Sequence, residues 1–120
     1  MVVDDNLQFA SAVATYLAGD ENFEVLAIAC SGDEALARAG DERPDLMLID
    51  INMPGMTGLA VAASLKALEA PPKVVMMTLE DSAEHRSKAM VAGADAYLPK
   101  HEFARELPRV VKGLFCGAPG

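Results

Sequence analysis

The chain of 120 residues is poor in aromatic side chains, contains no Trp and has only two cysteines. Aromatic residues make up 5% of the sequence. No uninterrupted apolar run approaches the roughly 18–20 residues that span a bilayer. The first residues, MVVDDN, have neither the basic region nor the apolar core of a signal peptide. We therefore expect a cytoplasmic protein that does not bind membranes.

The two cysteines, Cys30 and Cys116, lie too far apart for a CxxC or similar metal-binding spacing. We expect both to be buried as small apolar side chains in a reducing compartment. Basic side chains are also scarce, with 10 Lys and Arg against 18 Asp and Glu, so the formal net charge is −8. An acidic surface repels phosphate backbones, which argues against direct nucleic-acid binding. It suits a cation or a basic partner surface.

What the chain does contain is globular composition, with 52% hydrophobic and 23% charged residues, and a regular alternation of short apolar runs with segments of helical period. The first helix shows an apolar stripe of Leu7, Ala10, Ala14 and Leu17, with Asn6 as its cap. The predicted strands cover residues 2–3, 25–30, 46–49, 74–77 and 96–98, and the predicted helices cover 7–17, 32–40, 59–68, 83–93 and 103–114.

Five β/α units without repeats indicate an α/β fold. Strands that are apolar throughout and separated by helices favour a parallel sheet covered on both faces. Right-handed crossovers make a doubly wound (βα)5 arrangement, a three-layer sandwich, the most favourable topology. In such sheets ligands bind beyond the carboxyl ends of the strands, so the residues that follow each strand matter most.

Polar side chains follow four of the five predicted strands: Asp4 and Asp5, then Asp50, Thr78 and Lys100. Each alone has an ordinary explanation, such as a helix N-cap, a turn residue or a solvated lysine. Because parallel strands end at one edge, we expect the five side chains to converge. Hard oxygen ligands without His or Cys favour Mg²⁺ over zinc. Such a site is equipped to receive a phosphoryl group, with Asp50 as the attacking carboxylate.

These residues also form a known pattern. The DD pair after the first strand, D-x-N-M-P-x-M-x-G from Asp50 to Gly58, the Thr after the fourth strand and Y-L-x-K ending at Lys100 resemble the receiver domain of bacterial two-component response regulators. The resemblance to these CheY-like domains covers essentially the whole chain. It implies a flavodoxin-like fold with a parallel five-stranded sheet of order 2-1-3-4-5.

The resemblance assigns roles around the metal and the phosphoryl group. It implies that Asp50 is the phosphoacceptor. It also implies that Asp5 and Asp50, with the backbone carbonyl of Asn52, bind Mg²⁺ directly, and that Asp4 acts through metal-bound water. Thr78 and Lys100 would contact the phosphoryl group.

Tyr97 matches the aromatic residue whose rotamer reports phosphorylation in this family. Thr78, drawn toward the phosphoryl group, would vacate space that Tyr97 fills, so the two form the expected switch. A static Tyr packed on a helix is the alternative.

The sequence departs from the family pattern in three places. His101 follows Lys100 where many receivers have Pro, whereas Pro99 precedes the lysine. Leu79 is bulkier than the small residue usual after the threonine, and we expect it to narrow access to the site. The first strand has only three residues before the acids, so we expect the natural chain to begin upstream of Met1.

We therefore expect a phosphoacceptor switch of a two-component phosphorelay and not an enzyme, beyond phosphorylation and dephosphorylation of itself. Its partner would be a sensor histidine kinase. Residues 1–116 would form the receiver and 117–120 a tail or the start of a linker. The passage GLFCGAPG resembles the one that leads to the DNA-binding domain in NarL/FixJ-type transcription regulators. A stand-alone receiver remains the alternative.

Two further alternatives belong to other classes. A pseudo-receiver would act only as a binding module and never carry phosphate. A Mg²⁺-dependent phosphohydrolase of haloacid-dehalogenase type needs a D-x-D pair, but the second position is Asn52, which cannot protonate a leaving group.

Residues outside the motifs carry weaker signals. His85 and His101 are expected to be solvent-exposed. A basic set on the last two helices is either a solvated face or a surface for partners and for a phosphorylation-dependent homodimer. It comprises Arg86, Lys88, Arg105, Arg109 and Lys112.

Overall fold

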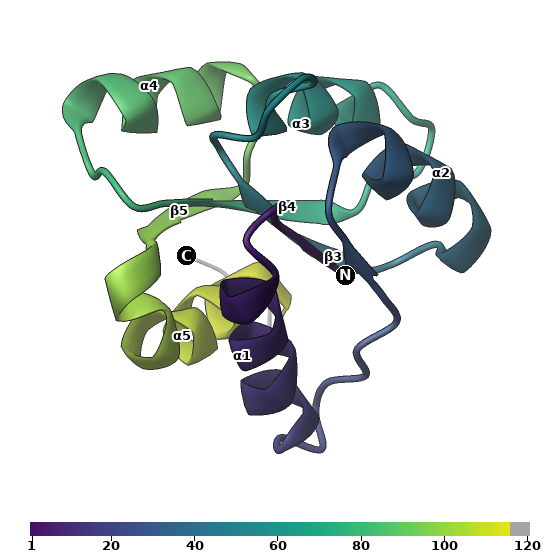
Figure 1. The fold of residues 1–120 in the computed structure, drawn as a ribbon, viewed down its shortest axis with the longest axis vertical. Helices are drawn as coiled ribbons and strands as arrows, with labels where there is room; N and C mark the ends of the chain where they lie inside the picture. Colours follow the sequence, from purple (N-terminus) through teal and green to yellow (C-terminus); the bar gives the residue numbers. More distant parts are fainter. Residues whose placement is uncertain (116–120) are drawn as a thin grey trace.

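The computed structural model describes residues 1–115. Its centre is a parallel five-stranded sheet of order β2-β1-β3-β4-β5, as the family resemblance implied. Helices α2, α3 and α4 cover one face and α1 and α5 the other (Figure 1). The strands are β1 (Val2–Val3), β2 (Ile28–Ala29), β3 (Leu46–Asp50), β4 (Lys73–Thr78) and β5 (Ala96–Pro99). The helices are α1 (Leu7–Ala18), α2 (Gly32–Glu42), α3 (Gly58–Lys66), α4 (Ala83–Val91), the 3-10 helix η1 (Lys100–Glu102) and α5 (Phe103–Phe115).

Side chains cap the helix starts. The predicted cap Asn6 accepts a hydrogen bond from the Phe9 amide at 3.1 Å, and Ser82 accepts one from the His85 amide at 3.0 Å. Thr57 caps α3 in the same way. These bonds satisfy amides that have no partner inside the helix. They fix where each helix leaves the edge of the sheet that carries the polar residues.

The sheet separates two apolar cores. On one face the buried side chains of α2, α3 and α4, such as Ala35, Leu65 and Ala89, pack against the sheet. On the other face α1 and α5 contribute Val13, Leu17 and Leu107 among others. Burial on both faces explains why the strand residues from Met47 to Ile49 are all apolar. The predicted three-layer sandwich is confirmed.

The apolar stripes of two helices differ from the prediction. In α1 the buried residues are Ala10, Val13 and Leu17, whereas Leu7 is 57% exposed. Leu7 lies in the first turn, before the helix packs against the sheet. Helix α3 ends at Lys66, so Leu68 lies in the following turn and is 51% exposed. Helical spacing identifies a face but not where along it the contact with the sheet begins.

The second strand is shorter than predicted. The sequence pattern predicts a strand over residues 25–30, yet β2 contains only Ile28–Ala29. The partner of β2 is β1, which itself has two residues, and the pairs are Val2 with Ile28 and Val3 with Ala29. A strand cannot extend its ladder beyond its partner. The length of β1 therefore sets the length of β2.

The expected burial of Cys30 is wrong. It is exposed, because β2 ends at Ala29 and the chain leaves the sheet there. Its amide donates to the Glu34 carboxylate at 2.7 Å, and hydrogen bonding and charge from Glu34 raise the pKa of the Cys30 thiol. Cys116 lies outside the described residues. No helix within residues 1–115 is long and apolar enough to cross a membrane.

An ion pair that the sequence did not reveal connects α3 to β4 and β5. The Lys66 Nζ lies 2.5 Å from Asp95 Oδ2 and donates to the Pro72 carbonyl at 2.9 Å. The same Asp95 oxygen accepts the Val74 amide at 2.8 Å. Asp95 lies two residues after Gly93, whose φ of 100° reverses the chain after α4. The pair therefore fixes the start of two strands.

We predict that Asp95→Ala lowers the free energy of unfolding by about 2–3 kcal/mol, because it leaves the Val74 amide without its acceptor and removes the carboxylate paired with the Lys66 ammonium. Urea denaturation followed by circular dichroism measures the change. Glu69→Ala, at an exposed site, is the matched control and should change stability by no more than about 0.5 kcal/mol. Equal stabilities of the Asp95→Ala and Glu69→Ala proteins would contradict the assignment.

Candidate functional site

Five predicted site residues lie at the carboxyl edge of the sheet. Asp4 and Asp5 follow β1, Asp50 and Thr78 are the last residues of β3 and β4, and Lys100 is the first residue after β5. Asp4, Asp50, Thr78 and Lys100 are all buried, whereas Asp5 is exposed. Charged side chains are almost never fully buried unless they are paired. The burial of the charged side chains of Asp4, Asp50 and Lys100 therefore indicates that they are paired within a functional site.

The three carboxylates form one cluster. Asp4, Asp5 and Asp50 each place a carboxylate oxygen within 4.8 Å of the others. Lys100 Nζ lies 2.6 Å from Asp4 Oδ2 and 3.5 Å from Asp50 Oδ2. Three negative charges so close repel one another, and one ammonium offsets only part of that repulsion. The cluster retains a net negative charge that attracts a cation.

Burial and repulsion act most clearly on Asp50. The Asp50 residue is 6% exposed. Its burial raises the pKa of its carboxyl to about 6, the charge of Asp4 contributes to the rise, and Lys100 and the Asn52 amide oppose it. At a pH of about 7.5 most of the carboxylate is still ionised. Asp50 is therefore an ionised carboxylate with little water around it. Such a group can serve as a nucleophile.

The loop behind Asp50 folds back tightly against it. The Gly58 amide donates to the Ile51 carbonyl at 3.2 Å. A Cβ atom at position 58 would lie 2.0 Å from the Asp50 carbonyl oxygen, so only glycine fits there. The Asn52 amide donates to Asp50 Oδ1 at 3.2 Å. The loop therefore orients the carboxylate and keeps residues 51–57 beside it.

The Thr78 hydroxyl forms hydrogen bonds with the backbone of the loop that follows β4. Its Oγ1 accepts the Glu80 amide and donates to the Glu80 carbonyl, both at 3.1 Å. The intervening Leu79 is 75% exposed and makes little contact with the rest of the protein. The bulk of this side chain predicts narrowed access to the site. The expectation stays a prediction, because the exposure of Leu79 does not show whether its side chain lies across the entrance to the site.

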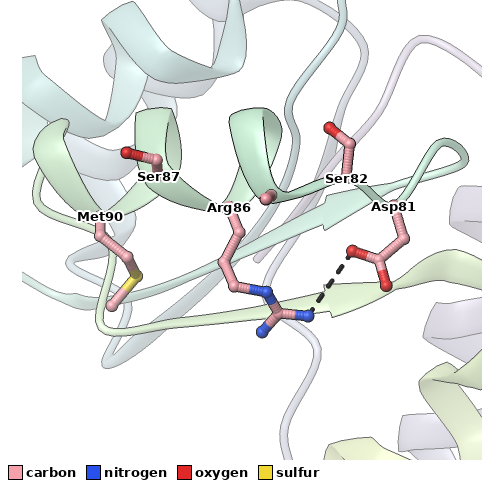
Figure 2. Close-up of a pocket in the computed structure, with 6 residues that line it drawn as sticks. Asp81, Ser82, Arg86, Ser87 and Met90 are labelled. Atoms are coloured by element: carbon pink, nitrogen blue, oxygen red, sulfur yellow. Dashed lines mark ion pairs between the residues drawn. The ribbon is translucent and has the colours of Figure 1, made fainter.

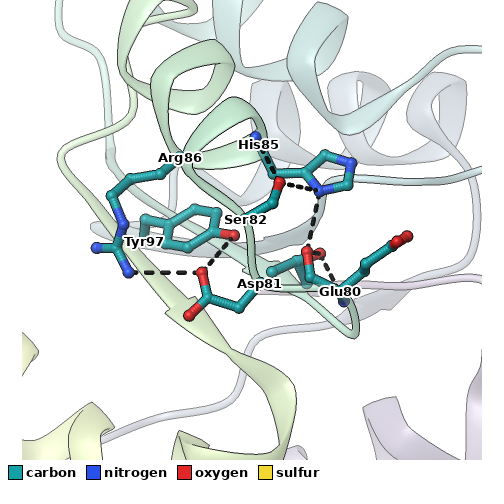
Figure 3. Close-up of polar contacts among 7 residues, drawn as sticks. Glu80, Asp81, Ser82, His85, Arg86 and Tyr97 are labelled. Carbon is teal, nitrogen blue, oxygen red and sulfur yellow. Dashed lines mark hydrogen bonds and ion pairs between the residues drawn. The ribbon is translucent and has the colours of Figure 1, made fainter.

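Tyr97 lies in β5 and is 8% exposed. Its hydroxyl donates to Asp81 Oδ1 at 3.1 Å, and the Arg86 guanidinium lies 4.6 Å from the centre of its ring (Figure 3). Arg86 also pairs with Asp81 at 3.5 Å. Burial is the main cause that raises the pKa of Tyr97, with Asp81 as a further one. Tyr97 is thus joined to the start of α4.

His85 is half-buried, which corrects the expectation that it is exposed. Its Nδ1 lies 2.9 Å from the Glu80 carbonyl and 3.0 Å from Ser82 Oγ (Figure 3). The histidine lies in the first turn of α4, where it folds back onto the loop that precedes the helix. His101 is exposed, as expected.

A shallow pocket of about 590 Å³ opens beside this network. It lies along α4, and its lining includes Asp81, Arg86 and Met90 (Figure 2). None of the three clustered aspartates lines it. The pocket is therefore separate from the acidic cluster and borders the contacts of Tyr97.

The donor set of the cluster fits a hard cation. All three side chains offer carboxylate oxygens. Within residues 1–115, the buried Asp4 Oδ2 has no donor other than the Lys100 ammonium. An oxygen with spare accepting capacity in an anionic cluster suits a metal ion or its bound water.

The raised pKa of Asp50 predicts how pH affects stability. The folded protein binds this proton more tightly than the unfolded chain does, so the group adds stability as the pH falls through about 6. We expect the unfolding free energy in EDTA, relative to that of Asp50→Asn, to rise by about 1.4 kcal/mol from about pH 7.5 to about pH 5. Urea denaturation at each pH measures it.

The comparison must be a difference between the two proteins. The Met1 amino group, whose pKa burial lowers to about 6, titrates in the same range in both. Its contribution cancels when one free energy is subtracted from the other. A difference that does not change with pH would show that Asp50 titrates normally.

Comparison with known proteins agrees with this arrangement. The family model described as the response regulator receiver domain matches residues 1–112. The transcriptional regulatory protein PrrA of Mycobacterium tuberculosis is 37% identical over 95% of this chain and 48% of that protein. Response regulator GacA of Pseudomonas viridiflava is 30% identical over 98% of this chain and 55% of that protein. The chain therefore spans about half the length of these curated relatives.

Solved structures show the same fold. The signal receiver domain of NarL from Mycobacterium tuberculosis is 30% identical, with a TM-score of 0.89 over 97% of this chain and 94% of that one. A DNA-binding response regulator of the LuxR family from Staphylococcus aureus is 28% identical, with a TM-score of 0.86 over 94% of each chain. The chain belongs to the response regulator receiver domain family, the phosphoacceptor signalling domains of two-component systems.

Proposed function

We propose that Asp50 accepts a phosphoryl group from a sensor histidine kinase, and that this charge change switches a protein-interaction surface. The observation that carries the proposal is the convergence of Asp4, Asp5 and Asp50 within 4.8 Å beside the buried Lys100. Receiver domains of two-component systems interact with histidine kinases, which supports the choice of donor.

The proposed transfer is a displacement at phosphorus. An Asp50 carboxylate oxygen attacks the phosphorus of a phosphohistidine, a P–O bond forms and the P–N bond breaks. The electron pair of the broken bond stays on the imidazole nitrogen, which takes up a proton. The product is an acyl phosphate on Asp50. Lys100, 3.5 Å from Asp50, would offset charge on the transferred group.

We propose Mg²⁺ as the cofactor, held by Asp5, Asp50 and the backbone carbonyl of Asn52, with Asp4 acting through water. Carboxylate and carbonyl oxygens suit this ion. When bound, it supplies positive charge that stabilises the negative oxygens of a phosphoryl group. Asp4 then has two tasks, since it also pairs with Lys100 at 2.6 Å and so fixes the lysine beside the acceptor.

The proposed switch runs through the loop between β4 and α4. Thr78 is bonded to Glu80, and the next residue, Asp81, is bonded to Tyr97. If the Thr78 hydroxyl donates to a phosphoryl oxygen, it must give up its bond to the Glu80 carbonyl, because it has a single proton to donate. The loop can then shift and with it the Asp81 acceptor of Tyr97. Two adjacent loop residues thus couple the site to α4.

The output is also proposed. Relatives named as transcriptional regulators are about twice as long as this chain, which supports control of transcription in the cytoplasm through a part that these residues lack. Residues 1–116 would form the receiver and 117–120 would form a tail or begin a linker. Arg86, Lys88, Arg105 and Arg109, which are largely exposed on α4 and α5, would take part in a homodimer formed on phosphorylation.

We predict that acetyl phosphate with Mg²⁺ adds one phosphoryl group to the intact protein, measured by mass spectrometry. Asp50→Asn should abolish the adduct because an amide cannot form the acyl phosphate. Asp41→Asn, which changes an exposed acid of α2, is the matched control and should leave it unchanged. EDTA should prevent the reaction.

Other outcomes separate the alternatives. A folded protein without an adduct would favour a binding module that never carries phosphate. Steady release of phosphate from unrelated monoesters would favour a phosphohydrolase. An adduct that survives in base would not be an acyl phosphate and would exclude Asp50 as the acceptor.

For the switch, we predict that phosphorylation changes the fluorescence of Tyr97 in a Tyr16→Phe background, where it is the remaining tyrosine. Adding Thr78→Ala should remove this change although the adduct still forms, because the side chain can no longer exchange Glu80 for the phosphoryl group. Thr78→Ser, which keeps the hydroxyl, should restore it. A full fluorescence change in the Thr78→Ala protein would refute the coupling.

A further inference from the structure

Lys100 has an aromatic neighbour in addition to its acidic ones. Its Nζ lies 4.7 Å from the centre of the Phe9 ring, while Asp4 and Asp50 lie 2.6 and 3.5 Å from it. The lysine is 4% exposed, so little water reaches the ammonium. The face of an aromatic ring carries negative electrostatic potential and attracts a cation, most strongly where both are shielded from water.

The Phe9 ring is itself held in place by neighbouring aromatic residues. Phe103 meets Phe9 edge to face, with 5.4 Å between ring centres, and Tyr16 meets Phe103 at 5.5 Å. The Tyr16 hydroxyl donates to the Ala104 carbonyl at 3.0 Å. These contacts join α1 to the start of α5, just after Lys100. The ring is therefore fixed relative to the backbone that carries the lysine.

We infer that Phe9 is a positioning residue for Lys100 in phosphoryl transfer, an inference that rests on the proposed function. Asp4 is the nearer acceptor and competes with the reacting group on Asp50 for the ammonium. A hydrogen bond would fix the ammonium to one acceptor, but a ring face stabilises the cation without choosing between them. Phe9 thus shields the Lys100 ammonium from water and leaves it able to turn from Asp4 to a phosphoryl oxygen.

Substitutions of Phe9 can distinguish an effect of its aromatic ring from an effect of its apolar volume. Phe9→Leu keeps an apolar side chain but loses the ring face, and we expect the rate constant of phosphorylation by acetyl phosphate at saturating Mg²⁺ to fall about three- to tenfold. Phe9→Tyr keeps the ring face and should remain within about twofold of the unsubstituted protein. Phe23→Leu, the same change at a partly buried site of the same core, should leave the rate unchanged.

A second measurement does not depend on phosphorylation. Protons over a ring face resonate upfield, so NMR should show the Lys100 ε-methylene protons shifted upfield in the unsubstituted protein and in Phe9→Tyr. The shift should be absent in Phe9→Leu.

The outcomes distinguish the role of Phe9 from the proposed phosphorylation of Asp50. Equal phosphorylation rates for Phe9→Leu and the unsubstituted protein would overturn the role of Phe9 and leave Asp50 as acceptor. No adduct in any protein would overturn the proposed function, and the NMR shift would then decide alone whether the ring holds the ammonium. Absence of that shift in the unsubstituted protein would overturn the inference.

Discussion

The burial of one ammonium among carboxylates is the constraint on which this structure depends. Lys100 lies 2.6 Å from Asp4 and 3.5 Å from Asp50, and all three side chains are buried. Without the lysine, Asp4 and Asp50 would either bind protons or destabilise the edge of the sheet through their mutual repulsion. With it, the cluster keeps a net negative charge and a carboxylate whose pKa is raised to about 6. The lysine therefore offsets part of the repulsion between the buried carboxylates and leaves the cluster with a net negative charge.

The rest of the fold keeps these groups in place. Parallel strands carry Asp50 and Thr78 to one edge, and the close approach of Gly58 to the Asp50 carbonyl holds the following loop against it. At the other end of the strands, Lys66 and Asp95 fix the starts of β4 and β5. Beside the lysine, Phe9 and Phe103 join α1 to α5. Each device removes freedom from a backbone segment that ends in a functional side chain, which is the purpose of a rigid scaffold around a site.

Contacts of the β4–α4 loop explain how a change at the edge could reach the surface. Thr78 bonds Glu80, Asp81 bonds Tyr97, and Arg86 covers the Tyr97 ring. The loop is held by a few polar contacts and its Leu79 is exposed, so it has little apolar packing to lose when it moves. Segments with few buried apolar contacts open at low free-energy cost. The proposed switch would therefore combine a closely packed loop around Asp50 with a loop between β4 and α4 that has few apolar contacts.

The sequence by itself determined the layered fold and the order of strands and helices along the chain, because strand ends and helix caps are local signals. It also determined the convergence of Asp4, Asp5, Asp50, Thr78 and Lys100, because parallel pairing brings strand ends together, whereas the order of the strands in the sheet came from the family resemblance. Only the tertiary structure decided which helical positions are buried, as Leu7 and Val13 show, and that Cys30 is exposed where β2 stops. It also decided the partners of distant side chains: Lys66 with Asp95, Tyr97 with Asp81, and Lys100 with Phe9. These contacts depend on how elements far apart in the chain are placed in space, and no periodicity within one element contains that information.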